Sequence, residues 1–268
     1  MPASALMNVM IGAARKAGRS LTRDFGEVEN LQVSVKGPGN FVSAADHKAE
    51  EIIFAELSKA RPGYCFLMEE RGEVVGDDRT HRWIVDPLDG TTNFLHGVPL
   101  FAISIGLERE GQLVAGVVYN PIADEMYTAE KGKGAYLNDR RRLRVAARKQ
   151  LSDALVTTGI PHLGRPGHAG FLSEMRHVMQ EVAGVRRTGS AALDLAWTAA
   201  GRFDAYWERN IQPWDTAAGI VIVREAGGTV SDLSGGSQMF ERLEVLAGNG
   251  HMQKAVLRLI SEVPAAAR

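Results

Sequence analysis

The chain has 268 residues and a formal net charge of −1, with 45% hydrophobic and 24% charged residues. This length supports one large domain or two closely packed ones with a sizeable core, and the composition argues against a disordered chain. Interleaved, nearly balanced charges give no attraction to nucleic acid or to a membrane surface, and no apolar run approaches the roughly 20 residues needed to span a bilayer.

The N-terminal segment predicts an amphipathic helix over residues 5–25, where apolar residues recur at a spacing of three to four. Residues 1–11 lack the charged start and long apolar core of a signal peptide. Cys65 is the single cysteine, so the chain can form no internal disulfide. These features together predict a cytoplasmic protein.

The next elements are a glycine-rich hairpin or loop within residues 33–41 and a second helix. Ser43 is a typical N-cap for this helix, Asp46 falls in its first turn, and residues 61–63 (Arg-Pro-Gly) end it. Short buried strands are expected at residues 64–67, which lead to Glu69, and at residues 83–85.

The remainder predicts further strands mixed with helices. We expect strands at residues 102–107, 114–119, 126–129, 155–158 and 203–207. We also expect a helix that ends near residue 182 and three more helices at residues 191–200, 214–225 and 251–260. Strands and helices do not alternate strictly, as they would in a barrel, so the fold class is α+β with layered packing.

The segment after the strand at residues 83–85 is the strongest candidate for a chemical site. Asp86 and Asp89 are three residues apart, with Pro87 between them and Gly90 after them, which suits a tight loop. Two carboxylates and a backbone carbonyl are oxygen ligands of the kind that Mg²⁺ prefers. Thr91 lies where a short helix can begin, with free N–H groups that can bind an anion. The alternative is an Asp-rich turn closed by ordinary side-chain hydrogen bonds.

Three separated motifs in this chain resemble those of the inositol monophosphatase family. They are the string WIVDPLDGTTNF at residues 83–94, the string WDTAAG at residues 214–219, and the acidic pair at residues 69–70. The resemblance covers nearly the whole chain. It implies the layered α/β/α/β/α sandwich of sugar phosphatases, with an N-terminal metal-binding part of about residues 1–145 and a C-terminal substrate-wall part of about residues 146–268.

The resemblance also implies the metal ligands. Glu69, Asp86 and the carbonyl of Leu88 would hold one Mg²⁺, and Asp86, Asp89 and Asp215 a second. Glu69 would help to bind a third, weaker ion, so two to three ions are expected per active site.

The implied mechanism is direct in-line attack of a metal-activated water on the phosphorus atom. Thr91, oriented by Asp46 and acting with Glu69, would position and help to deprotonate this water. The N–H groups of Gly90, Thr91 and Thr92 would bind phosphate oxygens. For Asp46, a purely structural role in capping its helix is the alternative.

The expected substrate wall comes from the second half of the chain. Gly189, Ser190 and Ala191 open a helix whose N–H groups could bind substrate hydroxyls, and simple N-capping by Ser190 is compatible with this role. Glu208 matches a position expected to accept hydrogen bonds from vicinal hydroxyls. Lys36 would belong to a mobile loop that closes over the metals.

We therefore expect a phosphoric monoester hydrolase that converts inositol monophosphate to myo-inositol and phosphate. The resemblance implies Mg²⁺ dependence, lithium sensitivity and a homodimer. One alternative is a related phosphatase for fructose bisphosphate, bisphosphorylated nucleotides or NADP, whose second phosphate would need extra cations, with Lys36, Arg187 and Arg209 as candidates. The other is a bacterial relative with an additional role in association with RNA polymerase.

Overall fold

Local sequence signals account for the two N-terminal helices of the computed structural model, which describes residues 4–27, 33–37 and 40–263. Helix α1 begins after Ser4, whose hydroxyl accepts the Met7 N–H at 3.1 Å. Helix α2 begins after Ser43, and the Asp46 carboxylate accepts the Ser43 N–H in return, which completes a capping box. Both starts satisfy N–H groups that a helix end leaves without partners.

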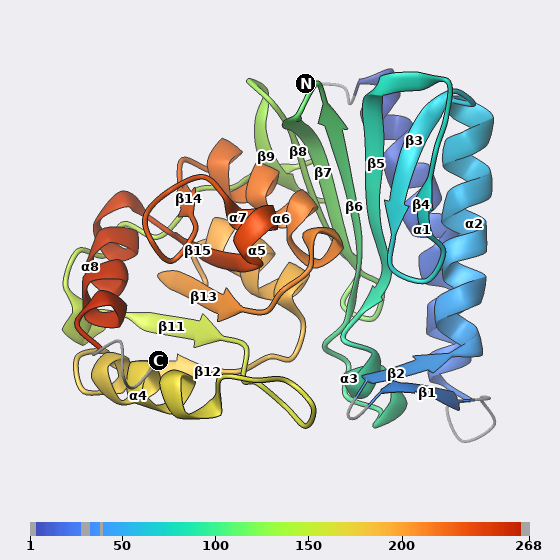
Figure 1. Ribbon diagram of the computed structural model, residues 1–268. Helices are drawn as coiled ribbons and strands as arrows, with labels where there is room; N and C mark the ends of the chain where they lie inside the picture. The colour runs from blue at the N-terminus through green and yellow to red at the C-terminus, as the bar shows by residue number, and fades with distance from the viewer. Residues whose placement is uncertain (1–3, 28–32, 38–39, 264–268) are drawn as a thin grey trace.

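The elements fall in the order drawn in Figure 1. The helices are α1 Ala5–Phe25, α2 Ala44–Ala60, α3 Thr91–Leu95, α4 His168–Met179, α5 Ala191–Ala199, α6 Pro213–Glu225, α7 Met239–Arg242 and α8 Gly250–Ser261, with a 3-10 helix at Leu151–Asp153. The strands are β1 Val33–Gly37, β2 Asn40–Ser43, β3 Tyr64–Met68, β4 Gly72–Val74, β5 Asp78–Asp89, β6 Ala102–Arg109, β7 Gln112–Asn120, β8 Glu125–Glu130, β9 Gly134–Leu137, β10 Arg141–Arg142, β11 Leu155–Thr158, β12 Gly184–Arg186, β13 Ala205–Arg209, β14 Thr229–Ser231 and β15 Glu244–Gly248.

Within the described residues, these strands form two large sheets and one hairpin. The larger sheet has the order β10-β9-β8-β7-β6-β5-β3-β4, the smaller one β12-β11-β13-β15-β14, and β1 pairs with β2. In the larger sheet β3 and β5 run parallel and the other neighbours are antiparallel.

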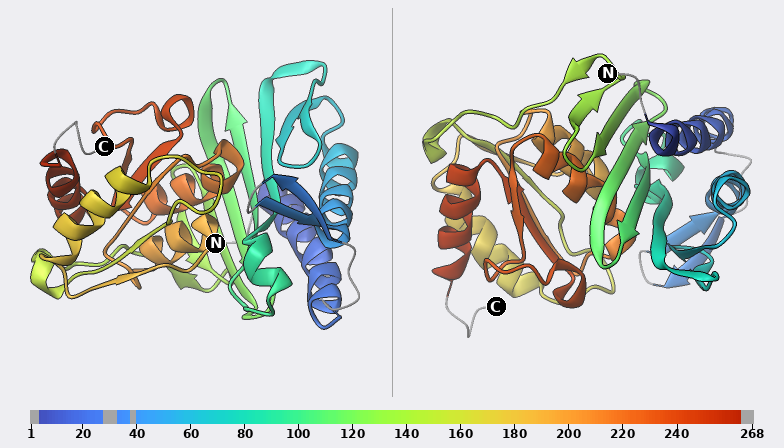
Figure 2. Two further views of the ribbon diagram at one scale, coloured as in Figure 1. Left: turned by 60° about the horizontal axis from the view of Figure 1, so that its bottom comes forward. Right: turned by 90° about the horizontal axis from the view of Figure 1, so that it is seen from above.

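Helices separate and cover the two sheets. Helices α1 and α2 lie together on one face of the larger sheet, α5 and α6 fill the space between the sheets, and α4 and α8 cover the outer face of the smaller sheet (Figure 1). The two views in Figure 2 show the same helix layers between and outside the two sheets. This arrangement confirms the expected α/β/α/β/α sandwich, because each helix layer buries the apolar face of a sheet.

Glycines let the central helix α6 approach the larger sheet closely. A Cβ atom at Gly116 on β7 would lie 2.4 Å from the carbonyl oxygen of Ala218, and one at Gly106 on β6 would lie 2.9 Å from the Cβ of Ala217. Backbone therefore meets backbone here, and the packing holds the start of α6, which carries Asp215, against the sheet that carries Asp86.

The structure also corrects the element boundaries. The strand predicted at residues 83–85 is much longer, since β5 runs from Asp78 through Asp89 and the predicted tight loop is its C-terminal end. The helix expected to end near residue 182 ends at Met179. The short elements β4, β9, β10, β12 and α7 were not predicted, because segments of two to four residues carry little periodicity. Within residues 4–27, 33–37 and 40–263, no helix is both long and apolar enough to cross a membrane.

Candidate active site

A β-bulge explains how two carboxylates three residues apart face the same side. In a regular strand, residues i and i+3 point to opposite faces of the sheet. Asp86 pairs with Ser104 and Asp89 with Ala102, so β5 advances three residues where β6 advances two. The extra residue reverses the alternation and brings both Asp side chains to the same face at the end of the sheet, the face that α6 covers.

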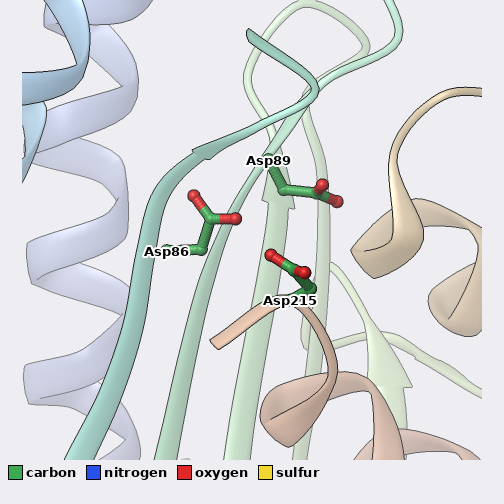
Figure 3. A group of neighbouring side chains, drawn as sticks. All are labelled: Asp86, Asp89 and Asp215. Atoms are coloured by element: carbon green, nitrogen blue, oxygen red, sulfur yellow. The ribbon is translucent and has the colours of Figure 1, made fainter. Parts of the chain in front are cut away.

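The third carboxylate, Asp215, comes from the first turn of α6. Its side chain accepts the Gln212 N–H at 2.9 Å, which fixes it as part of a capping box. One carboxylate oxygen from each of Asp86, Asp89 and Asp215 lies within 4.8 Å of the others. Figure 3 shows the three side chains converging from the end of β5 and the start of α6.

Burial and mutual repulsion dominate the electrostatics of this cluster. Burial, and then the nearby charges of Glu69 and Asp89, raise the pKa of Asp86 well above its usual value. Burial, Asp89 and Glu69 do the same for the pKa of Asp215. Three clustered carboxylates destabilise one another unless they bind protons or a cation, and hard oxygen donors of this kind fit Mg²⁺.

Asp89 is also held by the N-terminus of α5. Its Oδ2 atom accepts the Ser190 hydroxyl at 2.6 Å and the Ala192 N–H at 2.7 Å. Burial raises the pKa of Asp89 to about 6, although these hydrogen bonds favour the ionised form. The predicted capping by Ser190 is present, since its oxygen accepts the Leu193 N–H, and the donors of this helix start are directed at Asp89.

Thr91 lies at the start of α3, where the sequence suggested a short helix, after Gly90 in the left-handed region at φ 99°. Its hydroxyl oxygen is 3.0 Å from Asp46 Oδ1 and 3.1 Å from the carbonyl oxygen of Leu88. The other Asp46 oxygen, Oδ2, accepts the N–H and hydroxyl of Ser43. Asp46 therefore both caps α2 and contacts Thr91, so its capping role is compatible with the predicted role in orienting Thr91, which stays a prediction.

A pocket of about 140 Å³ joins these groups to the second half of the chain. Its lining includes every predicted metal ligand and substrate-wall residue: Glu69, Asp86, Leu88, Asp89, Gly90, Thr91, Thr92, Gly189, Ser190, Ala191, Glu208 and Asp215. Asp46 does not line the pocket and reaches it through Thr91.

Glu208 lies on β13 and lines the same pocket as the carboxylate cluster. Tyr206 donates its hydroxyl to Glu208 Oε2 at 2.7 Å. Burial raises the pKa of Glu208 to about 7, against the opposing effects of the Tyr206 hydrogen bond and the charge of Arg165. This carboxylate can accept hydrogen bonds from a bound hydroxyl compound.

Sequence reasoning missed several residues of the same pocket. Ile160, His162, Arg165 and Asp194 line it but had no predicted role. Arg165 comes from a loop, where it donates to the Asn210 carbonyl at 2.7 Å, and no periodicity or motif marks that loop. Arg187, a candidate for binding a second phosphate, does line the pocket.

Other candidates lie away from the pocket. Arg209 pairs with Glu174 and Glu244 instead, which excludes it as a pocket cation in this structure. Lys36 lies on β1, and its side chain falls outside the described residues.

Comparison with known proteins decides the family. A profile of the Inositol monophosphatase family matches residues 3–265. The chain belongs to the inositol monophosphatase family. It is 65% identical over 268 residues to the inositol-1-monophosphatase of Mesorhizobium japonicum, covering 100% of both chains. Family membership makes it a metal-dependent phosphoric monoester hydrolase.

Two further relatives extend the similarity. The chain is 42% identical over 259 residues to the Nus factor SuhB of Pseudomonas aeruginosa, covering 95% of each. The crystal structure of the extragenic suppressor protein SuhB of Bartonella henselae superposes with a TM-score of 0.94 at 61% identity, covering 97% of this chain and 99% of that one. The high TM-score confirms the fold over nearly the whole length.

Proposed function

We propose that this protein catalyses the Mg²⁺-dependent hydrolysis of inositol monophosphate to myo-inositol and phosphate. The observation that carries the proposal is the convergence of Asp86, Asp89 and Asp215, within 4.8 Å of one another, in a pocket that Glu69 and Thr91 also line. The named relative at 65% identity supports the choice of substrate.

The metal assignment follows from the donor atoms. Glu69, Asp86 and the Leu88 carbonyl would hold one Mg²⁺, Asp86, Asp89 and Asp215 a second, and Glu69 would contribute to a third. Bound Mg²⁺ would polarise the phosphoryl group, stabilise the leaving alkoxide and lower the pKa of a water molecule. The raised pKa values of Asp86 and Asp215 support this assignment, since a cation removes their repulsion.

Thr91 and Asp46 would orient the attacking water. When the Thr91 hydroxyl donates to Asp46, its oxygen lone pairs are available to accept a hydrogen of a water in the pocket. Glu69, which lines the same pocket, would share in taking up the proton. The water would attack the phosphorus atom in line with the leaving oxygen, without a covalent phospho-enzyme.

The remaining lining would hold the two ends of the substrate. The N–H groups of Gly90, Thr91 and Thr92 would bind phosphate oxygens. Glu208 would accept hydrogen bonds from hydroxyls of the alcohol, and the α5 start at residues 189–191 would form the adjoining wall. We further propose a cytoplasmic homodimer that lithium inhibits.

A bisphosphate ester is a second candidate substrate, because Arg165 and Arg187 line the pocket on the side of Glu208. Two guanidinium groups there can bind a second phosphate. If so, Arg187→Ala would reduce kcat/KM for fructose bisphosphate far more than for inositol 1-phosphate.

The decisive experiment measures phosphate release from a panel of esters with purified protein. We expect inositol 1-phosphate to have the highest kcat/KM, EDTA to abolish turnover, and Asp86→Asn and Asp215→Asn to be inactive. Asp153→Asn, which changes an exposed carboxylate outside the pocket, is the control and should retain full activity. Undiminished turnover in EDTA would exclude the proposed mechanism.

The similarity to the Nus factor SuhB supports one further candidate, a role in association with RNA polymerase. Co-purification with polymerase, together with complementation by the Asp86→Asn variant, would separate this role from catalysis. Loss of the cellular role in that variant would tie it to the chemistry.

A further inference from the structure

A second buried carboxylate lies on α2, one helical turn after Asp46. Glu50 is only 3% exposed, although it is ionisable and lies outside the active-site pocket. Residues four apart on a helix share a face, so Asp46 and Glu50 both point from α2 toward the end of the larger sheet. Burying a carboxylate is costly unless it accepts hydrogen bonds, so its partners reveal its role.

The partners of Glu50 all belong to the turn at residues 69–71: two backbone N–H groups and the Arg71 guanidinium, whose Nε lies 3.8 Å from Glu50 Oε1. Glu50 Oε2 accepts the Glu70 N–H at 2.9 Å and the Arg71 N–H at 3.3 Å. This turn joins β3 to β4, which pair through Met68 and Gly72. On its other side, the Glu69 N–H donates to the Val85 carbonyl at 3.2 Å.

Glu69 lies in this turn, apart from the compact carboxylate trio and next to an edge of the sheet. The compact carboxylate trio consists of Asp86, Asp89 and Asp215 and does not include Glu69, although Glu69 lines the same pocket. Asp86 and Asp89 lie at the end of a long central strand. Glu69 instead follows β3, next to the three-residue edge strand β4, where the sheet offers less support.

We propose that Glu50 is a positioning residue that fixes the backbone of the Glu69 turn for metal binding, resting on the metal site of the proposed function. Helix α2 then orients two parts of the site from one face. Asp46 holds the Thr91 hydroxyl, and Glu50 holds the turn that carries Glu69.

Two conservative variants separate the reach of this side chain from its charge. Glu50→Gln keeps the length and an acceptor oxygen, so it can still receive both N–H groups. Glu50→Asp keeps the charge but is one methylene shorter, so it withdraws the acceptor from the turn. Glu51→Asp is the matched control, because Glu51 is the exposed neighbour that, like Glu50, pairs with the Arg71 side chain.

The primary readout is Mg²⁺ binding by isothermal titration calorimetry, with no substrate present. We expect Glu50→Asp to weaken Mg²⁺ affinity by about tenfold or more, in the range found for residues that support metal ligands. Glu50→Gln and Glu51→Asp should bind as the wild type does. In turnover assays, Glu50→Asp should raise the Mg²⁺ concentration for half-maximal rate, with KM for the ester unchanged at saturating Mg²⁺.

Wild-type Mg²⁺ affinity in Glu50→Asp, or an equal loss in Glu50→Gln, would overturn the proposal. Thermal unfolding in EDTA is the control for stability. A general loss of stability would lower the Tm of a variant but would not produce different Mg²⁺ affinities in the Asp and Gln variants. Because calorimetry needs no substrate, a protein that binds Mg²⁺ but hydrolyses no ester would refute the proposed function and leave this test intact.

Discussion

Single side chains in the pocket make structural contacts and also have proposed chemical roles, and Thr91 is the clearest case. Thr91→Val keeps the shape of the side chain and removes the hydroxyl that contacts Asp46. We expect kcat to fall by about 10²-fold or more, as for loss of a group that positions a proton transfer. Mg²⁺ affinity should change little, because the hydroxyl is not among the expected ligands.

Steady-state kinetics at saturating Mg²⁺ checks this expectation. Thr22→Val, on the exposed side of α1, is the control and should leave kcat unchanged. A Thr91→Val variant with wild-type kcat would exclude Thr91 from the chemistry.

Glu208 makes a prediction about pH. Its folded-state pKa of about 7 lies above the ordinary value of 4.5, so the folded state holds this proton more tightly than the unfolded chain does. Ionisation of Glu208 therefore lowers the stability of the folded state. This loss is absent below about pH 4.5, grows as pH rises, and is complete above about pH 7. Glu208→Gln removes the charge and keeps an acceptor for the Tyr206 hydroxyl.

Thermal unfolding of the metal-free protein measures this effect. We expect the Glu208→Gln variant to melt a few degrees above the wild type at pH 8 and at nearly the same temperature at pH 4.5. A gain that is equal at both pH values would show that ionisation of Glu208 is not its cause.

At the scale of elements, the contact between α6 and the larger sheet requires glycine. Gly116→Ala places a methyl group 2.4 Å from the Ala218 carbonyl oxygen, inside van der Waals contact. We expect a loss of stability of about 1–3 kcal/mol or more, since two backbones must move apart. Because α6 carries Asp215, Mg²⁺ affinity should fall as well.

Chemical denaturation and calorimetry test both effects. Gly12→Ala is the matched control, since Gly12 lies on the exposed face of α1 with no atom within 4 Å of the added methyl. Alanine is the better helix former, so this control should be neutral or stabilising by up to about 1 kcal/mol.

Most of these elements were predictable from sequence because their signals are local. Ser43 with Asp46 marks the start of α2, and the periodicity of residues 5–25 marks α1. The end of β5 was misjudged as a loop, because Pro87 and Gly90 suggest a turn and a bulge has no clear sequence signature. The motifs likewise identified Asp86 and Asp215, whereas the roles of Arg165 and Glu50 depend on contacts with residues distant in sequence.

At the scale of the whole molecule, the metal site joins parts that lie far apart in the sequence. Asp86 and Asp89 lie at the end of β5 in the larger sheet, Glu69 lies in the turn after β3 of the same sheet, and Asp215 comes from the central helix layer. We propose that the division near residue 145 separates two sheets rather than two independently folding domains, because α5 and α6 contact strands of both.

Mg²⁺ should therefore stabilise the entire chain. A ligand that binds only the folded state at about 100 times its dissociation constant contributes about 2.7 kcal/mol. We expect the Tm of the wild type to rise by several degrees on adding Mg²⁺ and the Tm of Asp86→Asn to stay unchanged. A metal-induced rise that persists in Asp86→Asn would place the stabilising ion elsewhere.

The enclosure of α6 between the two sheets has a consequence for hydrogen exchange. Residues 216–223 of this helix are all buried, so a deuteron from solvent reaches their amides mainly when the whole molecule opens. Their exchange rates then report the global unfolding equilibrium. A cation held at Asp215 should slow exchange at the far end of the helix as much as beside the ion.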